Sequence, residues 1–276
     1  MSLQGRKRKP LWLCILVLLA LYVLQGVTLG MMDVVPLYLV SYKATWKQLG
    51  MLSFIMYPFS IKLLWAPLID VFYIRRLGRR RTWLLPTQLI LGTTFIILSF
   101  YFESLLVQLR VIKLTIILFF VIFLIATQDI CVDGWALTLF GCSNVIWQSI
   151  SQMIGYPLGH FFGSSFLLTF ESANMTNRLI RQPLHMPDQP YGLFTLAQFL
   201  RFWGVLFLIT TCAVTFLFRE PQSSIRDKKE FGLLGTYLYI LQLFKKKCFR
   251  QLLVILLGSH IGYTASSVMT FAVLIK

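Results

Sequence analysis

Several ionisable residues lie within long apolar stretches of the sequence, where their types and positions could do chemistry. The candidates are Asp33, Lys62, Asp129, Asp133 and His160, with Arg201 near the end of its segment. Burying a charge in lipid is costly, so an ionisable residue inside an apolar segment is a functional candidate by default. Such side chains can pair with one another, carry a proton or orient an anionic solute. We therefore expect them to face a protein interior or an aqueous cavity.

Asp129 and Asp133 are four residues apart, so both would project from one face of a helix. Their spacing resembles the DxxxD motif of intramembrane prenyltransferases, which hold magnesium and a diphosphate. Those enzymes need a second acidic motif, and none is visible in this sequence, so an enzyme is a distant alternative. The pair could serve transport, or it could form a salt bridge that only stabilises packing, and both interpretations stay open.

Lys62, Asp33 and His160 have competing interpretations. Lys62 could extend to the membrane interface or pair with Asp129 or Asp133, and we favour the pairing slightly. Asp33 is expected near the end of its helix, where water would solvate it. His160 lies on a glycine-rich face, where a packing role is favoured over a proton relay.

These residues belong to seven apolar segments in a chain that is 57% hydrophobic and only 13% charged. Segments of this length fit membrane helices, because a helix satisfies its own backbone hydrogen bonds in lipid. We therefore predict an all-α integral membrane protein. The segments are 11–40, 47–71, 83–102, 112–140, 145–170, 198–218 and 251–275.

The placement of lysine and arginine predicts the topology. If the N-terminus is cytosolic, most basic residues fall on the cytosolic side, as the positive-inside rule requires. The loop 171–197 then lies on the opposite side. It contains the acceptor tripeptide that begins at Asn174, a glycosylation candidate.

A basic cluster follows the second segment and determines topology. The same cluster could raise the concentration of an anionic solute at the cytosolic mouth. It consists of Arg75, Arg76, Arg79, Arg80 and Arg81.

Four small residues recur every four positions in the fifth segment: Ser151, Gly155, Gly159 and Gly163. Such a stripe allows another helix to approach closely. Static packing is the favoured interpretation, and a sliding contact between two moving halves is the alternative.

The sequence divides into four predicted parts: a basic cytosolic N-terminus at 1–10, a six-helix lobe at 11–218, a cytosolic loop at 219–250 and a seventh helix at 251–276. The loop contains apolar residues at helical spacing before a lysine run, which predicts an interfacial amphipathic helix. Those apolar residues are Phe231, Leu234, Leu238, Leu241 and Phe244.

Several function classes lack support. The net charge of +16 sits in short clusters between apolar runs, so no nucleic acid partner is predicted. No Walker, GxGxxG, HExxH or CxxC pattern occurs. We accordingly predict no catalytic residue, metal or cofactor.

Several local stretches are similar to the eukaryotic acetyl-coenzyme A transporter family, and they occur in order from the first segment to the sixth. Those in the second and fourth segments are long and specific. The matching stretches are 22–26, 58–70, 78–80, 83–88, 126–137, 170–173 and 202–204.

This resemblance implies a major facilitator carrier, in which two six-helix lobes usually rock around a central site. It implies movement of acetyl-coenzyme A from the cytosol into the endoplasmic reticulum lumen. The site in this lobe would draw on Gln25, Lys62, Trp65, Asp129 and Asp133. Another anionic or muropeptide-like solute is the alternative, because bacterial muropeptide permeases are more distant relatives.

The sequence departs from the family in two respects. It stops at Lys276, after the seventh segment, so we expect a fragment that lacks the C-terminal lobe. Asp33 stands where a small polar residue is expected. The expected partners are the lipid bilayer, the transported solute and the C-terminal lobe, and homo-oligomer formation is left open.

Overall fold

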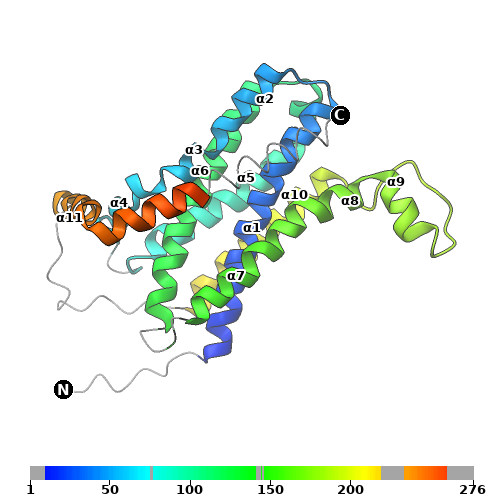
Figure 1. Cartoon of the computed structure of the whole chain (residues 1–276). Helices are drawn as coiled ribbons and strands as arrows, with labels where there is room; N and C mark the ends of the chain where they lie inside the picture. The colour runs from blue at the N-terminus through cyan, green and yellow to red at the C-terminus, as the bar shows by residue number, and fades with distance from the viewer. Residues whose placement is uncertain (1–9, 75–76, 141–143, 145, 219–232, 260–276) are drawn as a thin grey trace. The chain divides into compact units, whose positions relative to one another are not determined.

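The computed structural model describes residues 10–74, 77–140, 144, 146–218 and 233–259. Every regular element in these ranges is helical (Figure 1). The chain forms two compact units, Met1–Ser224 and Ile225–Lys276. The predicted part boundaries at 10, 218 and 250 remain predictions.

Four helices in the described residues are long and apolar enough to cross a membrane. They are α1 (Leu11–Ser41), α5 (Arg81–Val107), α6 (Val111–Phe140) and α10 (Leu196–Leu217). Each meets the length of about 20 residues that a bilayer requires. The prediction of an all-α membrane bundle is confirmed.

The second apolar segment is not one continuous α-helix. It is divided into α2 (Trp46–Leu52), a 3-10 turn, α3 (Tyr57–Ser60), a second 3-10 turn and α4 (Ala66–Val71). Pro58 and Pro67 lie in the first turns of α3 and α4. Proline lacks the N–H that a helix interior needs, which explains why the α-helix restarts at these points.

The fifth segment changes its winding within a helical run. α7 (Ile146–Phe161) passes into a π-helical stretch, Phe162–Phe166, and then into α8 (Leu167–Glu171). π-helical stretches are uncommon and often occur at functional sites. After α8 come the short helix α9 (Ala173–Thr176) and a second π-helical stretch, Asn177–Arg181.

α5 and α10 pack antiparallel against each other. Near one end, the Arg81 guanidinium donates to the backbone oxygen of Thr215 at 3.0 Å. Near the other, Arg201 Nε donates to Ser99 Oγ at 3.1 Å. The residues before α5 and those before α10 therefore lie at opposite ends of the bundle.

The small-residue stripe, which runs along α7 and ends at Gly163 in the π-helical stretch, lies against α1. A Cβ on Gly159 would stand 2.1 Å from the backbone oxygen of Val23. A Cβ on Gly163 would stand at the same distance from the backbone oxygen of Val27. The contact runs parallel, because later residues of α7 meet later residues of α1. Ser151 and Gly155 are also buried.

The second unit contains α11 (Leu233–Lys245), which falls within the predicted loop. Leu238, Leu241 and Phe244 are exposed on it, whereas Phe231 lies outside the described residues. Residues 247–259 are also helical. The remainder of the seventh apolar segment lies outside the described residues.

Candidate functional site

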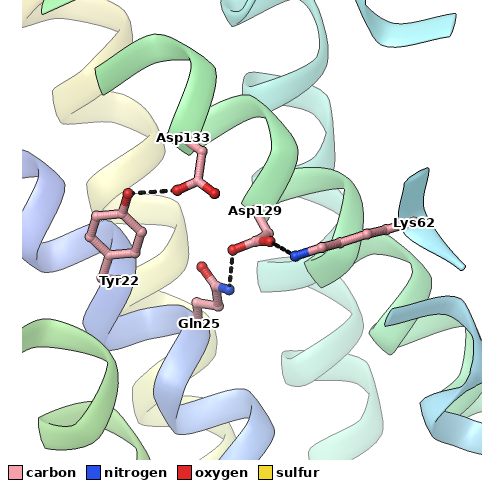
Figure 2. A network of polar contacts seen from close by, with 5 residues as sticks. All are labelled: Tyr22, Gln25, Lys62, Asp129 and Asp133. Atoms are coloured by element: carbon pink, nitrogen blue, oxygen red, sulfur yellow. Dashed lines mark hydrogen bonds and ion pairs between the residues drawn. The ribbon is translucent and has the colours of Figure 1, made fainter. Parts of the chain in front are cut away.

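Asp129 stands at the centre of a polar network between α1, α6 and the broken second segment (Figure 2). Its side chain is only 4% exposed. Gln25 Nε2 on α1 donates to Asp129 Oδ1 at 2.6 Å. Lys62 Nζ donates to Oδ2 and forms an ion pair with it. A buried carboxylate needs such partners, because an uncompensated charge in a protein interior is strongly unfavourable.

Asp133 receives a separate partner one helical turn away. The Tyr22 hydroxyl donates to Asp133 Oδ1 at 2.7 Å (Figure 2). Tyr22 and Gln25 lie about one turn apart on α1, as the two aspartates do on α6. Because the earlier α1 residue meets the later α6 residue, the two helices run antiparallel, and a polar face on each meets the other.

Lys62 reaches this network from the short 3-10 turn Lys62–Leu64. Its side chain is 36% exposed, and Nζ lies 4.4 Å from the centroid of the Phe59 ring. A cation over an aromatic face is favourable. The break after Ser60 thus presents a positive charge that contacts a buried carboxylate and remains partly open to an anion.

Trp65 lies three residues after Lys62 and packs against α6. Its ring centroid lies 5.0 Å from that of Phe123 on α6. Its Nε1 is buried and has no hydrogen-bond partner among the described residues. The Gln25 Oε1 atom is likewise buried without a partner among them. An unsatisfied buried polar atom costs about 1–3 kcal/mol, which a bound polar solute or water would relieve.

Two arginines of the basic cluster are engaged within the lobe. Arg80 forms an ion pair with Asp70 at 2.7 Å. The Arg80 side chain also lies on Gly134 of α6, where a Cβ would stand 2.3 Å from the guanidinium carbon. Arg81 is buried and contacts α10 as described above.

The remaining arginines of the cluster are less constrained or lie outside the described ranges. Arg79 is exposed, and its guanidinium lies 5.6 Å from the centroid of the Tyr73 ring. Arg75 and Arg76 lie outside the described residues. A role in gathering anions therefore remains a prediction, for which Arg79 is the best-described candidate.

The predicted glycosylation site has an exposed asparagine and a buried threonine. Asn174 lies on the surface of α9. Thr176 is fully buried, and its hydroxyl donates to the backbone oxygen of Phe170 at 3.1 Å. Modification of Asn174 remains a prediction, and the buried threonine indicates that it would have to precede folding.

Two site features were missed at the level of sequence. Tyr22 was not selected as a polar partner, although it lies three residues before Gln25 on the same helix. The second feature is the contact between Asp33 and His160, whose Oδ2 and Nε2 atoms lie 2.8 Å apart. His160 was predicted to be a packing residue, and its backbone indeed touches α1, but its ring also binds a carboxylate.

The described residues thus form a bundle of membrane-length helices with a charged network between them. The chain belongs to the acetyl-coenzyme A transporter 1 family, whose profile matches residues 14–234.

Related proteins fit this assignment. The chain is 29% identical over 255 residues to an uncharacterized protein of Schizosaccharomyces pombe, covering 92% of this chain and 47% of the relative. It is 30% identical over 224 residues to an uncharacterized membrane protein of Saccharomyces cerevisiae, covering 74% of this chain and 39% of the relative. The chain thus spans less than half the length of these two relatives.

A bacterial permease is also similar. The anhydromuropeptide permease of Escherichia coli is 30% identical over 113 residues, covering 41% of this chain and 22% of the permease. No solved structure is significantly similar to the chain.

Proposed function

We propose that the full-length protein moves acetyl-coenzyme A from the cytosol into the endoplasmic reticulum lumen by alternating access. Membership of the acetyl-coenzyme A transporter 1 family supports this solute. The proposed orientation has the N-terminus in the cytosol, in agreement with the positive-inside rule. In such carriers the substrate site lies near the middle of the membrane, between repeats that rock against each other.

The observation that carries the proposal is the Lys62–Asp129–Gln25 network. Acetyl-coenzyme A carries phosphates, and Lys62 is the cation in this network that can meet them. Asp129 orients Lys62, while Gln25 holds Asp129 on its other oxygen. A phosphate that reaches Lys62 would compete with Asp129 for the ammonium group. Arrival of the solute would therefore change contacts between the second segment, α1 and α6.

Replacement of Asp129 by asparagine tests this assignment. The amide cannot balance the Lys62 charge, so we expect Asp129→Asn to lower uptake of labelled acetyl-coenzyme A into vesicles about tenfold or more. Asp188→Asn is the matched control, because Asp188 is exposed in the loop before α10. Unchanged uptake by a normally folded Asp129→Asn variant would contradict the assignment.

The similarity to the anhydromuropeptide permease supports a second candidate, a carrier of another anionic or muropeptide-like solute. A competition panel separates the two. Excess unlabelled acetyl-coenzyme A should suppress uptake of its labelled form, and an anhydromuropeptide should not. The reverse result would favour the second candidate.

The chain of 276 residues alone is proposed to be a non-transporting part of the carrier. Reconstituted by itself, it should give no flux of acetyl-coenzyme A, whereas the full-length protein should. Flux through the isolated chain at a similar rate would refute this part of the proposal.

A further inference from the structure

Asp33 and His160 form an ionisable pair outside the Asp129 network. Asp33 lies on α1 and His160 on α7, and the closest atoms of their side chains are 2.8 Å apart. The two side chains are 56% and 36% exposed, respectively. The pair is thus accessible, unlike Asp129.

Asp33 occupies an unusual place on α1. All residues from Leu24 to Val35 except Asp33 are buried. A carboxylate exposed within a membrane-length helix is unfavourable unless it faces water or a cavity. Asp33 follows Tyr22 by 11 residues, which turns the helix through about three full turns. It therefore lies on nearly the same face of α1, about 16 Å further along the axis. One face of α1 thus bears two polar sites at different depths.

Backbone packing holds the pair together. A Cβ on Gly30 would stand 2.4 Å from the backbone oxygen of His160, so α1 and α7 touch at this level. The Tyr156 ring stacks near the imidazole, with centroids 6.3 Å apart. The close backbone approach thus keeps the His160 imidazole within reach of the Asp33 carboxylate.

The surrounding titratable groups are few in the described part of the chain. On α7 the neighbour is Tyr156. On α8 the titratable residue is Glu171, eleven positions after His160, and the Tyr38 hydroxyl of α1 contacts it. The Phe162–Phe166 stretch contains no titratable residue. On α6, Asp129 and Asp133 contact α1 residues located eight and eleven positions before Asp33.

We propose that Asp33 and His160 form a proton-binding site on the transport pathway, whose occupancy couples solute movement to a proton gradient. The inference rests on the proposed transporter function. Histidine is the side chain that ordinarily changes charge between pH 5 and 8. One proton from water adds to the imidazole, and the charge of the pair changes from −1 to zero. Because a net charge is costly to enclose, the protonated pair can be occluded between lobes far more easily.

The test compares two assays of the full-length protein in proteoliposomes. Counterflow of labelled acetyl-coenzyme A reports solute exchange without a gradient, and uptake under an imposed pH gradient reports coupling. Asp33→Asn and His160→Gln should lose the stimulation by the gradient, which we expect to be about fivefold or more in the parent protein. Asp33→Asn should retain counterflow within about twofold of the parent, because it removes the negative charge that opposes occlusion. His160→Gln leaves that charge in place and should slow counterflow as well.

Asp188→Asn and His185→Gln are matched controls, because they remove the same groups from an exposed loop. Both should keep the stimulation. Gradient stimulation that survives in Asp33→Asn and His160→Gln would overturn the inference. So would the loss of counterflow together with stimulation in an Asp33→Asn variant that remains monodisperse, because the pair would then serve exchange or packing instead.

A second readout is independent of the solute. In the purified chain with labelled histidine, the nuclear magnetic resonance signal of His160 should titrate between pH 5 and 8. Asp33→Asn should move the midpoint of this titration, whereas Asp188→Asn should leave it unchanged. A His160 signal that does not titrate in this range would overturn the proton site. If His160 titrates but no pH condition supports exchange of acetyl-coenzyme A, the proposed solute fails and the proton site stands.

Discussion

At the scale of residues, Asp129 shows how a charge is accommodated inside this lobe. Its two carboxylate oxygens receive different donors, an amide from α1 and an ammonium from the second segment. Breaking a buried ion pair is more harmful than replacing it, because the remaining charge stays buried without compensation. Lys62 and Asp129 should therefore behave as a unit when they are substituted.

A double-mutant cycle tests this coupling. Lys62→Met alone should lower the free energy of unfolding of the lobe by about 1–3 kcal/mol. This loss is smaller than that expected for a fully buried ion pair, because Lys62 is partly exposed. Adding Asp129→Asn should restore part of that loss. Thermal unfolding in detergent measures the effect, with Lys47→Met as the exposed-lysine control. Additive losses in the double variant would show that the two residues do not support each other.

Glu171 predicts a pH dependence outside the membrane spans. It lies at the end of α8, and burial raises its pKa from 4.5 to about 7, against a hydrogen bond with the Leu196 backbone that lowers the pKa. Because the folded state binds the proton more tightly than the unfolded chain, stability falls as the pH rises from about 4.5 to 7. Above about pH 7 the Glu171 carboxylate is ionised in the folded state, and the full free-energy cost of burying its charge lowers stability.

Glu171→Gln should remove this dependence. The variant should melt near the parent at pH 5 and a few degrees above it at pH 7.5. Melting temperatures across this range measure the difference, and Glu103→Gln controls for loss of an exposed carboxylate. A constant difference between parent and Glu171→Gln would show that Glu171 does not titrate there.

At the scale of elements, the contact between α1 and α7 depends on the absence of side chains. Gly159 and Gly163 meet backbone oxygens of α1, which cannot move aside as a flexible side chain can. This close approach also places His160 beside Asp33. The stripe therefore joins two helices within one lobe.

Gly159→Ala should separate α1 from α7 and destabilise the lobe by about 2 kcal/mol or more. Gly50→Ala is the control, since a Cβ on Gly50 of α2 meets nothing within 4 Å. Alanine there should be neutral or slightly stabilising, because glycine is unfavourable in a helix. Thermal unfolding of both variants checks the prediction, and equal melting temperatures would contradict it.

At the scale of the whole molecule, the antiparallel packing of α5 and α10 separates the ends of the first unit. Arg79 and Arg80 lie just before α5 and Arg81 begins it, whereas Asn174 lies on α9 in the region before α10. In the membrane, these two regions therefore lie on opposite sides. The positive-inside rule then predicts which side is cytosolic.

Cysteine labelling tests this topology. In a background without the native cysteines, Leu77→Cys should react with an impermeant maleimide from the cytosolic side, because Leu77 is exposed before α5. Asp188→Cys should react only after the membrane is permeabilised. Labelling of both from the same side would contradict the predicted topology.

Much of the fold could be predicted from the sequence. Long apolar segments with few charges indicate membrane helices, because an unpaired backbone is costly in lipid. The interruption of the second segment was not predicted, although Pro58 and Pro67 were visible signals. Within the candidate site, Asp129 and Lys62 were selected by their charge alone. Tyr22 was missed because a tyrosine in an apolar helix carries no equally strong signal.

The sequence by itself determined the class of protein, since hydropathy and family motifs are properties of the chain read in order. Only the tertiary structure decided which residues meet. Gln25 and Asp129 are separated by 104 positions, and His160 and Asp33 by 127. No local pattern specifies such contacts, because they depend on the direction and closeness of helix packing. The glycines of α7 allow that closeness, but their partner became evident only when α1 was placed against them.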